Sequence, residues 1–357
     1  MAVTGNGIAK MLDILVSKLD MIEHTPDMPW LQYGATMPIC FTSGMPLEGG
    51  SAVLADISMS LKNQRIPVFA SFIALKNRGL ILKPNQHGIP IPYTKVTIVH
   101  KDTGVKILPV EYNKLPLTEK DNYCFYSKSD YLTVFNIEQT KAEITHPELW
   151  HELQERYAGA PPSFQSVNRE FSEIDVLVES MRPNYIDYFP DKNVNGSLRD
   201  YYSKCAQVLA YIAYKSLPRQ NSDILAKEPK FALLASEIAG VFICSNYGIH
   251  AIPNPNFLSN ITGIRQLISS QPELLPDILL RSNRMGAVLN KELHRCEGEA
   301  CKQKATNHIS MYLEKASEIN RKVIGKDEQL GISIKGLLQK GKAENGKSVE
   351  SGISRSR

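Results

Sequence analysis

The sequence predicts an α+β protein in which a mixed N-terminal half precedes a helix-rich C-terminal half. Two observations support this fold class. Between residues 41 and 135, Gly and Pro divide the chain into short segments, some alternating like strands and others periodic like helices. Beyond residue 197, apolar residues recur at helical spacing in one long segment after another.

The N-terminal half is predicted to contain three helices and three strands. Residues 8–22 place apolar side chains along one helical face, and Pro26, Pro29 and Pro38 then impose an extended segment. Further helices are predicted at 51–62 and 69–77. Strands are predicted at 79–82, 95–100 and 131–136.

The C-terminal half is predicted to be helical. Helical periodicity covers residues 147–157, 197–215, 230–246, 256–270 and 274–292, with Pro272 and Pro276 marking the last break. Residues 175–181 fit either a helix or a strand. The segment 159–162 is a plausible linker, and residues 326–357, rich in Gly, Ser and Lys, are typical of a flexible basic tail.

The composition is that of an ordinary globular protein, with 357 residues that are 43% hydrophobic and 22% charged. A chain of this length buries roughly three quarters of its extended surface, so its stability requires no metal or disulfide, and we expect no cofactor. Six scattered cysteines, most in apolar contexts, favour a reducing, cytoplasmic compartment. The longest apolar stretch, Phe231–Cys244, is too short and too polar to span a bilayer, so we expect no membrane association.

One long segment of the chain lacks acidic residues. Between Asp56 and Asp102, 45 consecutive positions hold seven basic residues and no acid. Aromatic residues are interleaved with them: Phe69, Phe72 and Tyr93, with Trp30 upstream. Cations that follow phosphates and rings that stack on bases are typical of proteins that bind single-stranded nucleic acid. The alternative interpretation is that the rings belong to the core and the lysines to a solvated face.

Familiar catalytic motifs are absent from the sequence. It contains no HExxH helix motif, no glycine-rich phosphate loop and no nucleophile elbow. Four soft ligands lie close together in sequence, at His294, Cys296, Cys301 and His308, but they lack the short spacing that structural zinc sites favour. A zinc-dependent hydrolase built on these four residues is therefore the least favoured alternative.

More specific patterns occur in both halves. In the N-terminal half they are Met28–Trp30 with Pro38, the turn Ser43–Leu54, Val68–Gly79 with Leu82–Gly88, and the Val-Phe-Asn-Ile-Glu-Gln segment Val134–Gln139. In the C-terminal half they are Tyr201–Tyr211, Ser236–Cys244, Tyr247–Ile249 and Phe257–Leu289. In this order they resemble the ArdC-type antirestriction proteins of conjugative plasmids and mobile elements. Proteins of that family join an N-terminal single-stranded-DNA-binding domain to a C-terminal zincin-like metallopeptidase domain.

The resemblance implies a DNA-binding domain at 1–158, a zincin-like domain at 159–325 and the tail at 326–357. It strengthens the DNA-binding interpretation of the acid-free segment, although Phe69 stands where the family has tryptophan and Ser51 where it has asparagine. We expect phosphate contacts and stacking groups among the following residues: Lys62, Arg65, Lys76, Arg78 and Lys83, with Trp30, Phe69 and Phe72 as rings.

The metallopeptidase motif of the resembled family is lost from this chain. Gln207 stands at the first histidine, Val208 at the catalytic glutamate and Tyr211 at the second histidine. An amide, an aliphatic side chain and a phenol protonated near neutral pH cannot together hold zinc or act as a general base. Glu237 is retained, but one carboxylate cannot hold the metal alone. We therefore expect a pseudo-metallopeptidase without catalytic residues, metal or cofactor.

The leading hypothesis is a non-catalytic single-stranded-DNA-binding protein of a bacterial mobile element, with a role in antirestriction or DNA transfer. The alternative is a protein-interaction module whose degenerate zincin-like half docks a host or conjugation protein without binding DNA. The alternative predicts an exposed apolar patch on the C-terminal half.

Overall fold

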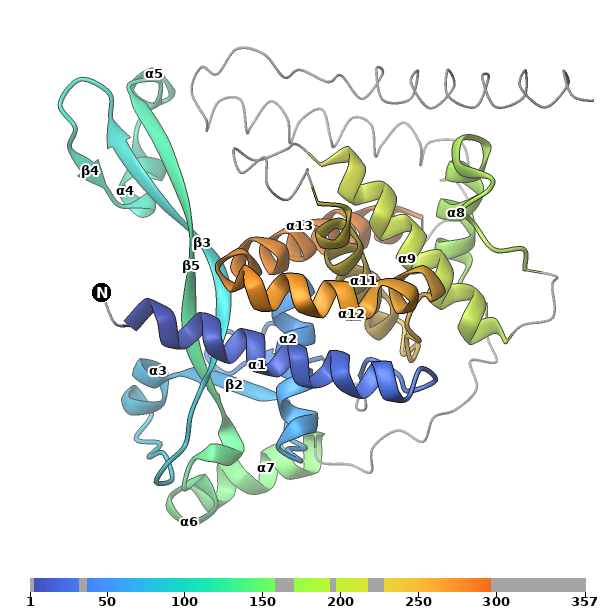
Figure 1. Ribbon diagram of the computed structural model, residues 1–357. Helices are drawn as coiled ribbons and strands as arrows, with labels where there is room; N and C mark the ends of the chain where they lie inside the picture. Colours follow the sequence, from blue (N-terminus) through green and yellow to red (C-terminus); the bar gives the residue numbers. More distant parts are fainter. Residues whose placement is uncertain (1–2, 32–36, 158–169, 193–196, 218–227, 297–357) are drawn as a thin grey trace, which may run out of the picture.

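The computed structural model describes residues 3–31, 37–157, 170–192, 197–217 and 228–296, and all structural statements concern these residues. The fold is mixed α+β, as the sequence predicted, with a five-stranded sheet beside a group of long helices (Figure 1). The linker at 159–162 and the tail at 326–357 lie outside the described residues. None of the helices within these ranges has the length and apolar character needed to cross a membrane.

The sheet is built around one long ribbon. β3 (Ile89–His100) pairs antiparallel with β5 (Tyr123–Asn136) along its whole length. β2 (Val68–Ser71) extends the sheet beyond β5, β1 (Ile39–Cys40) pairs parallel with β2, and β4 (Lys106–Ile107) pairs with the far end of β3. That end, together with the short helices α4 (Pro109–Lys114) and α5 (Leu117–Lys120), projects away from the rest of the molecule (Figure 1).

Two small cores cover opposite faces of the sheet, because alternate residues of a strand point to opposite sides. Phe69 of β2 packs with Ile89, Ile91 and Val134 against α2 (Gly49–Leu61). Val68 and Ala70 instead pack against α3 (Phe72–Asn77), α6 (Ala142–Thr145) and α7 (Pro147–Tyr157), with the one-turn helix η1 (Ile137–Gln139) between β5 and α6.

The main core joins N-terminal and C-terminal helices. α1 (Val3–His24) and α2 bury apolar side chains in one cluster with five later helices: α8 (Ser172–Tyr185), α9 (Leu198–Ser216), α11 (Pro229–Asn246), α12 (Pro255–Ser270) and α13 (Leu275–Arg295). The short helix η2 (Pro272–Leu274) separates α12 from α13. This core contains side chains from both sides of the boundary predicted at residues 158–159. The boundary itself lies outside the described residues and stays a prediction.

The start of α2 lies directly against α13. Gly49 has a φ of +51°, and a Cβ atom there would lie 2.3 Å from the Cα of Asn283. Asn283 also accepts a hydrogen bond from the backbone N–H of Ser51 at 3.1 Å and donates one to the Ser51 hydroxyl at 3.1 Å. Glycine is therefore required at position 49 both by the backbone conformation and by the close approach of the two helices.

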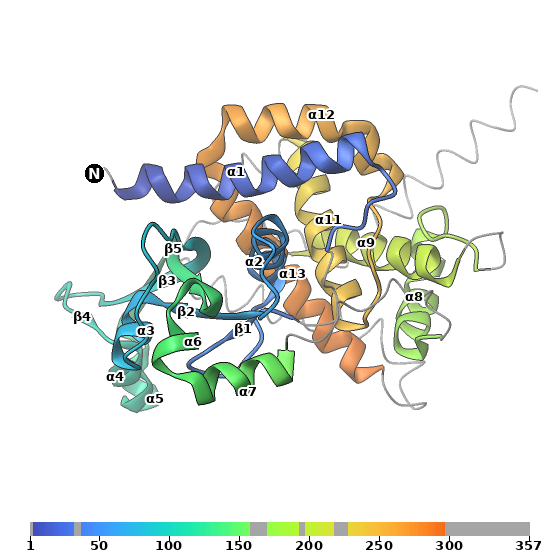
Figure 2. The same cartoon turned by 90° about the horizontal axis from the view of Figure 1, so that it is seen from below.

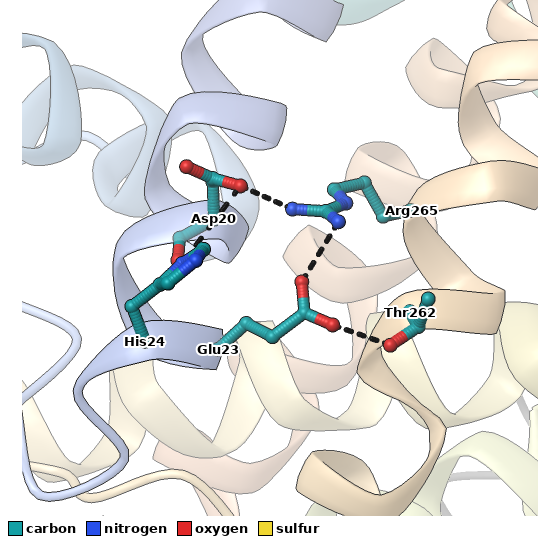
Figure 3. Close-up of polar contacts among 5 residues, drawn as sticks. All are labelled: Asp20, Glu23, His24, Thr262 and Arg265. Atoms are coloured by element: carbon teal, nitrogen blue, oxygen red, sulfur yellow. Dashed lines mark hydrogen bonds and ion pairs between the residues drawn. The ribbon is translucent and has the colours of Figure 1, made fainter.

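α1 runs beside α12 in both views (Figures 1 and 2). An ion-pair cluster joins the two helices (Figure 3): Arg265 on α12 contacts the carboxylate of Asp20 and, at 2.9 Å, that of Glu23. Glu23 also accepts a hydrogen bond from the hydroxyl of Thr262, and His24 lies 4.0 Å from the Asp20 carboxylate. These contacts attach the N-terminal helix to the C-terminal half of the chain.

Most predicted helices are present, with ends shifted by a few residues, and residues 175–181 belong to the helix α8. Two predictions are wrong. Residues 69–71, predicted as the start of the helix at 69–77, instead belong to the strand β2, because they pair with β5. Residues 79–82 form no strand and contribute only an isolated bridge between Leu82 and Thr140. The strands predicted at 95–100 and 131–136 are the ends of the longer β3 and β5.

Candidate functional site

The sequence singled out two places: the position of the lost metallopeptidase motif, which lies on α9 and α11, and a basic surface around residues 62–83. At the first, α9 and α11 cross closely enough for Gln207 and Glu237 to meet. Gly240 on α11 permits this approach, because a Cβ atom there would lie 2.9 Å from the Cα of Gln207. Both side chains are buried, with exposed fractions of 4% for Gln207 and 3% for Glu237.

A closed network of hydrogen bonds surrounds Glu237. Its Oε1 atom accepts from the Gln207 amide at 2.9 Å, from the Trp30 indole N–H at 2.9 Å and from the Asn254 backbone N–H at 3.1 Å. The Gln207 amide nitrogen also donates to the Ile252 carbonyl at 2.8 Å, while its oxygen accepts from the Asn254 side chain at 3.1 Å. Because both ends of the amide are engaged, its orientation is determined by the network.

The environment of Glu237 disfavours its charge. Burial raises the pKa of the Glu237 carboxyl to about 8, although hydrogen bonds from Asn254 and Trp30 oppose the shift. The carboxyl is therefore mostly protonated at pH 7. Three N–H donors already occupy one of its oxygens, the position that a cation would otherwise take.

The resemblance implies a metal at this position, and the residues present do not fit one. Gln207 turns its N–H group toward Glu237, Val208 packs against the main core, and Tyr211 stacks on Tyr188 at 6.4 Å with the Lys215 ammonium 4.6 Å from its ring. Within the described ranges, no group of three or more His, Cys, Asp or Glu residues is placed to hold a metal. No chemical step can be assigned to this centre.

The alternative zinc ligands do not converge where the structure describes them. His294 is exposed on α13, whereas Cys296 is buried in the main core at 3% exposure. Cys301 and His308 lie outside the described residues.

Two of the rings predicted to stack on DNA are in the interior. Trp30 and Phe69 are 1% and 2% exposed, so neither offers a face to a base, and the expectation for these two residues is corrected. Trp30 packs 5.6 Å from the ring of Phe257 and binds Glu237, while Phe69 belongs to the small core under α2. Their burial follows the alternative interpretation of the sequence, in which the rings are core.

Phe72 and two basic residues remain on the surface of α3. Phe72 is 56% exposed and Lys76 lies four residues later, on the same side of the helix. Arg78, which follows α3, is exposed and places its guanidinium 5.9 Å from the centre of the Phe41 ring. Among the described residues, neither Lys76 nor Arg78 forms an ion pair. We call these three residues, with Phe41, the α3 surface.

Of the other predicted cations, Lys62 and Lys83 have local partners for their ammonium groups. Lys62 donates to the His87 carbonyl at 3.2 Å, and burial together with the nearby charge of Lys10 lowers its pKa. Lys83 forms an ion pair with Glu143 at 3.3 Å. Arg65 is exposed just after α2, where Glu138 accepts from its backbone N–H at 2.6 Å.

Sequence reasoning missed three groups that contact the predicted site residues. Phe41 was not identified as the partner of Arg78, and Asn254 and the Ile252 carbonyl were not identified as partners of Gln207 and Glu237. Asn254 stands between two prolines, which marks a rigid turn but not its target. Only the three-dimensional path of the chain brings these groups together.

Exposed apolar side chains are concentrated in the N-terminal half. Of the large hydrophobic residues that are strongly exposed in the described ranges, only Ile186 and Tyr188 belong to the C-terminal half, at 62% and 53%. The apolar patch that the docking alternative predicts on that half therefore has little support among these residues.

The fold is similar to that of a known antirestriction protein. The metal-free crystal structure of the antirestriction protein ArdC from plasmid R388 matches with a TM-score of 0.52 and 16% identity, covering 80% of this chain and 97% of that one. Its Mn(II)-bound structure matches with a TM-score of 0.50 and 17% identity over the same shares. No family model matches the sequence, and neither does any curated protein. The chain therefore has an ArdC-like fold.

Proposed function

We propose that this protein is a single-stranded-DNA-binding protein of the antirestriction type, encoded by a mobile element, whose peptidase-like half is not catalytic. The observation that carries the DNA-binding part is the α3 surface, where an exposed ring and two exposed cations stand within seven consecutive residues and, in the described part of the chain, neither cation forms an ion pair. Rings that stack on bases and cations that neutralise phosphates are the two components of non-specific single-strand binding. The ArdC-like fold supports the antirestriction role by analogy.

The closed network around Glu237 supports the non-catalytic part. A general base or a metal ligand needs a free lone pair directed at a substrate or ion, and here the carboxylate and the amide are directed at each other. The pseudo-metallopeptidase half then acts as a scaffold that holds α1 and α2, and through them the sheet.

The binding test uses a fluorescently labelled single strand of about 20 nucleotides and the triple variant Phe72→Ala, Lys76→Glu, Arg78→Glu. We expect the variant to bind at least tenfold more weakly than the wild type, because it loses one ring and reverses two charges. The matched control is Lys215→Glu, Lys291→Glu, at two exposed lysines on α9 and α13. Equal affinities of the wild type and the triple variant, with both folded, would overturn the assignment to the α3 surface.

The scaffold role is tested by adding Mn(II) or Zn(II) to the wild-type protein. We expect neither ion to raise Tm, because no described residues fit a metal. A rise that depends on metal concentration, and that the variant Glu237→Gln abolishes, would show that the centre opens to a metal and would contradict the proposal.

A further inference from the structure

The middle of the β3–β5 ribbon is a two-stranded segment with free edges. β2 pairs only with residues 134–136 of β5, and β4 only with residues 98 and 99 of β3. In the described part of the chain, residues 93–97 and their partners at 126–130 therefore have no further strand on either edge. This segment lies between the body of the molecule and the projecting end (Figure 1).

One side of this segment faces the helices. The hydroxyl of Ser129 donates a hydrogen bond to Asp277 at the start of α13. The ring of Tyr131 lies against α1, since a Cβ atom on Gly7 would be 2.3 Å from it. In the register of the ribbon, Ser129 lies opposite Thr94 and Tyr131 opposite Pro92, so these positions share the side that contacts α1 and α13.

The other side of the ribbon packs against α2 at Ile89 and Ile91 and, farther along, presents two tyrosines and a lysine to solvent. Tyr93 and Lys95 alternate with Pro92 and Thr94, and Tyr126 lies opposite Thr97, so all three share the outer side. Tyr93 is 41% exposed, Tyr126 is 61% exposed, and Lys95 is exposed without an ion pair among the described residues. The acidic residue on this side is Asp130, to which the Tyr93 hydroxyl donates at 3.5 Å.

Two accessible rings on either side of a cation match the chemistry of an unpaired nucleic-acid strand. Unpaired bases offer their faces to aromatic rings, whereas a duplex hides those faces in its own stack. In the register of the ribbon, Lys95 stands between the positions of Tyr93 and Tyr126, and its ammonium group can neutralise a phosphate. The strand β3 also lies wholly within the acid-free segment between Asp56 and Asp102.

We infer that the outer side of the ribbon is a second contact for single-stranded DNA, in which Tyr93 and Tyr126 stack on bases and Lys95 binds the intervening phosphate. This inference rests on the proposed function and adds a site separate from the α3 surface. The ribbon then acts as an arm that holds a strand away from the body of the protein.

The test compares Tyr93→Ala, Tyr126→Ala with Tyr93→Phe, Tyr126→Phe in the full chain, using the same labelled single strand. Each lost ring should weaken binding about tenfold, while the phenylalanine variant should keep the wild-type affinity within about twofold. The control Tyr188→Ala removes a comparably exposed tyrosine from the turn that follows α8 and should have no effect. Photo-cross-linking to a bromodeoxyuridine-substituted strand should label peptides that contain residues 93 and 126.

The outcomes separate this inference from the proposed function. Unchanged affinity of the alanine variant, together with a loss in the α3 triple variant, would overturn the ribbon contact and leave the proposed function standing. An equal loss in the alanine and phenylalanine variants would rule out stacking by the rings. If the wild type binds no single strand at low salt, both proposals fail.

Discussion

The buried centre on α9 and α11 and the exposed α3 surface use their polar groups in opposite ways. Around Glu237, three N–H groups are directed at one carboxyl oxygen, and both ends of the Gln207 amide are bonded to other protein groups. On α3, Lys76 and Arg78 lie beside aromatic rings and have no acidic partner among the described residues. A polar cluster can therefore bind a ligand only where its members do not already form hydrogen bonds or ion pairs with one another.

The largest expected effect is the pH dependence of the free energy of unfolding. It depends on buried carboxyl groups and not on the α3 surface. Burial raises the pKa of Glu237 to about 8 and that of Asp56 to about 7, from unfolded values near 4. Because the folded state holds these protons more tightly, the stability they confer is complete below about pH 4. This contribution to stability decreases as the pH rises above about 4 and is lost once the pH has passed the folded pKa values of 7 to 8. The loss is on the order of 4 kcal/mol for each group.

Chemical denaturation between pH 5 and pH 9 measures this loss. Lys18 near Asp56 has its pKa lowered to about 8 by burial, so its contribution runs the other way, with stability gained above pH 8. The variant Glu237→Gln should show a shallower fall between pH 5 and pH 8. A wild-type stability that stays constant or rises over this range would show that these carboxyls are not buried as described.

The next largest effect should come from opening the network at Gln207. The change Gln207→Ala removes the acceptor of the Asn254 side-chain amide, one of the three donors to Glu237 and the stronger of two donors to the Ile252 carbonyl, at a cost of about 2 kcal/mol in the free energy of unfolding. Glu237→Gln is the matched control, and at pH 7 it should cost less than about 1 kcal/mol, because an amide oxygen can still accept the same bonds. A cost below about 1 kcal/mol for Gln207→Ala would mean that the centre is not a closed network.

The smallest effect should come from the ion pairs between α1 and α12. Removing the guanidinium by Arg265→Ala should lower the free energy of unfolding by about 1 kcal/mol, because Arg265 is only 26% exposed and contacts two carboxylates. Arg199→Ala, which removes a pair with the neighbouring Asp200, should cost less than about 0.5 kcal/mol. Equal effects of the two changes would mean that the cluster in Figure 3 does not hold α1 in place.

Hydropathy periodicity was sufficient to predict most helices, because α9, α11, α12 and α13 each bury one continuous stripe or nearly their whole surface. It failed at residues 69–71, where pairing with β5 outweighs the local helical pattern. It also could not distinguish buried from exposed rings. Trp30, Phe69 and Phe72 stand in similar contexts in the sequence, yet only Phe72 lies on the surface.

The candidate sites were only partly predictable, for a physical reason. Gln207 and Glu237 could be placed together by resemblance, but their hydrogen-bond partners are 17 to 207 positions distant from Glu237. Tyr126 joins Tyr93 and Lys95 only through the register of β5 against β3. Contacts of this kind depend on the fold as a whole, and no local pattern contains them.

The most direct test of the account is the salt dependence of single-strand binding by the wild type and by Lys76→Glu, Arg78→Glu. The logarithm of the binding constant should fall linearly with the logarithm of salt concentration, with a slope of about −0.7 for each phosphate neutralised. If Lys76 and Arg78 each neutralise one phosphate, the variant should have a slope shallower by about 1.4 units. Equal slopes for the two proteins, or no dependence on salt, would contradict the account.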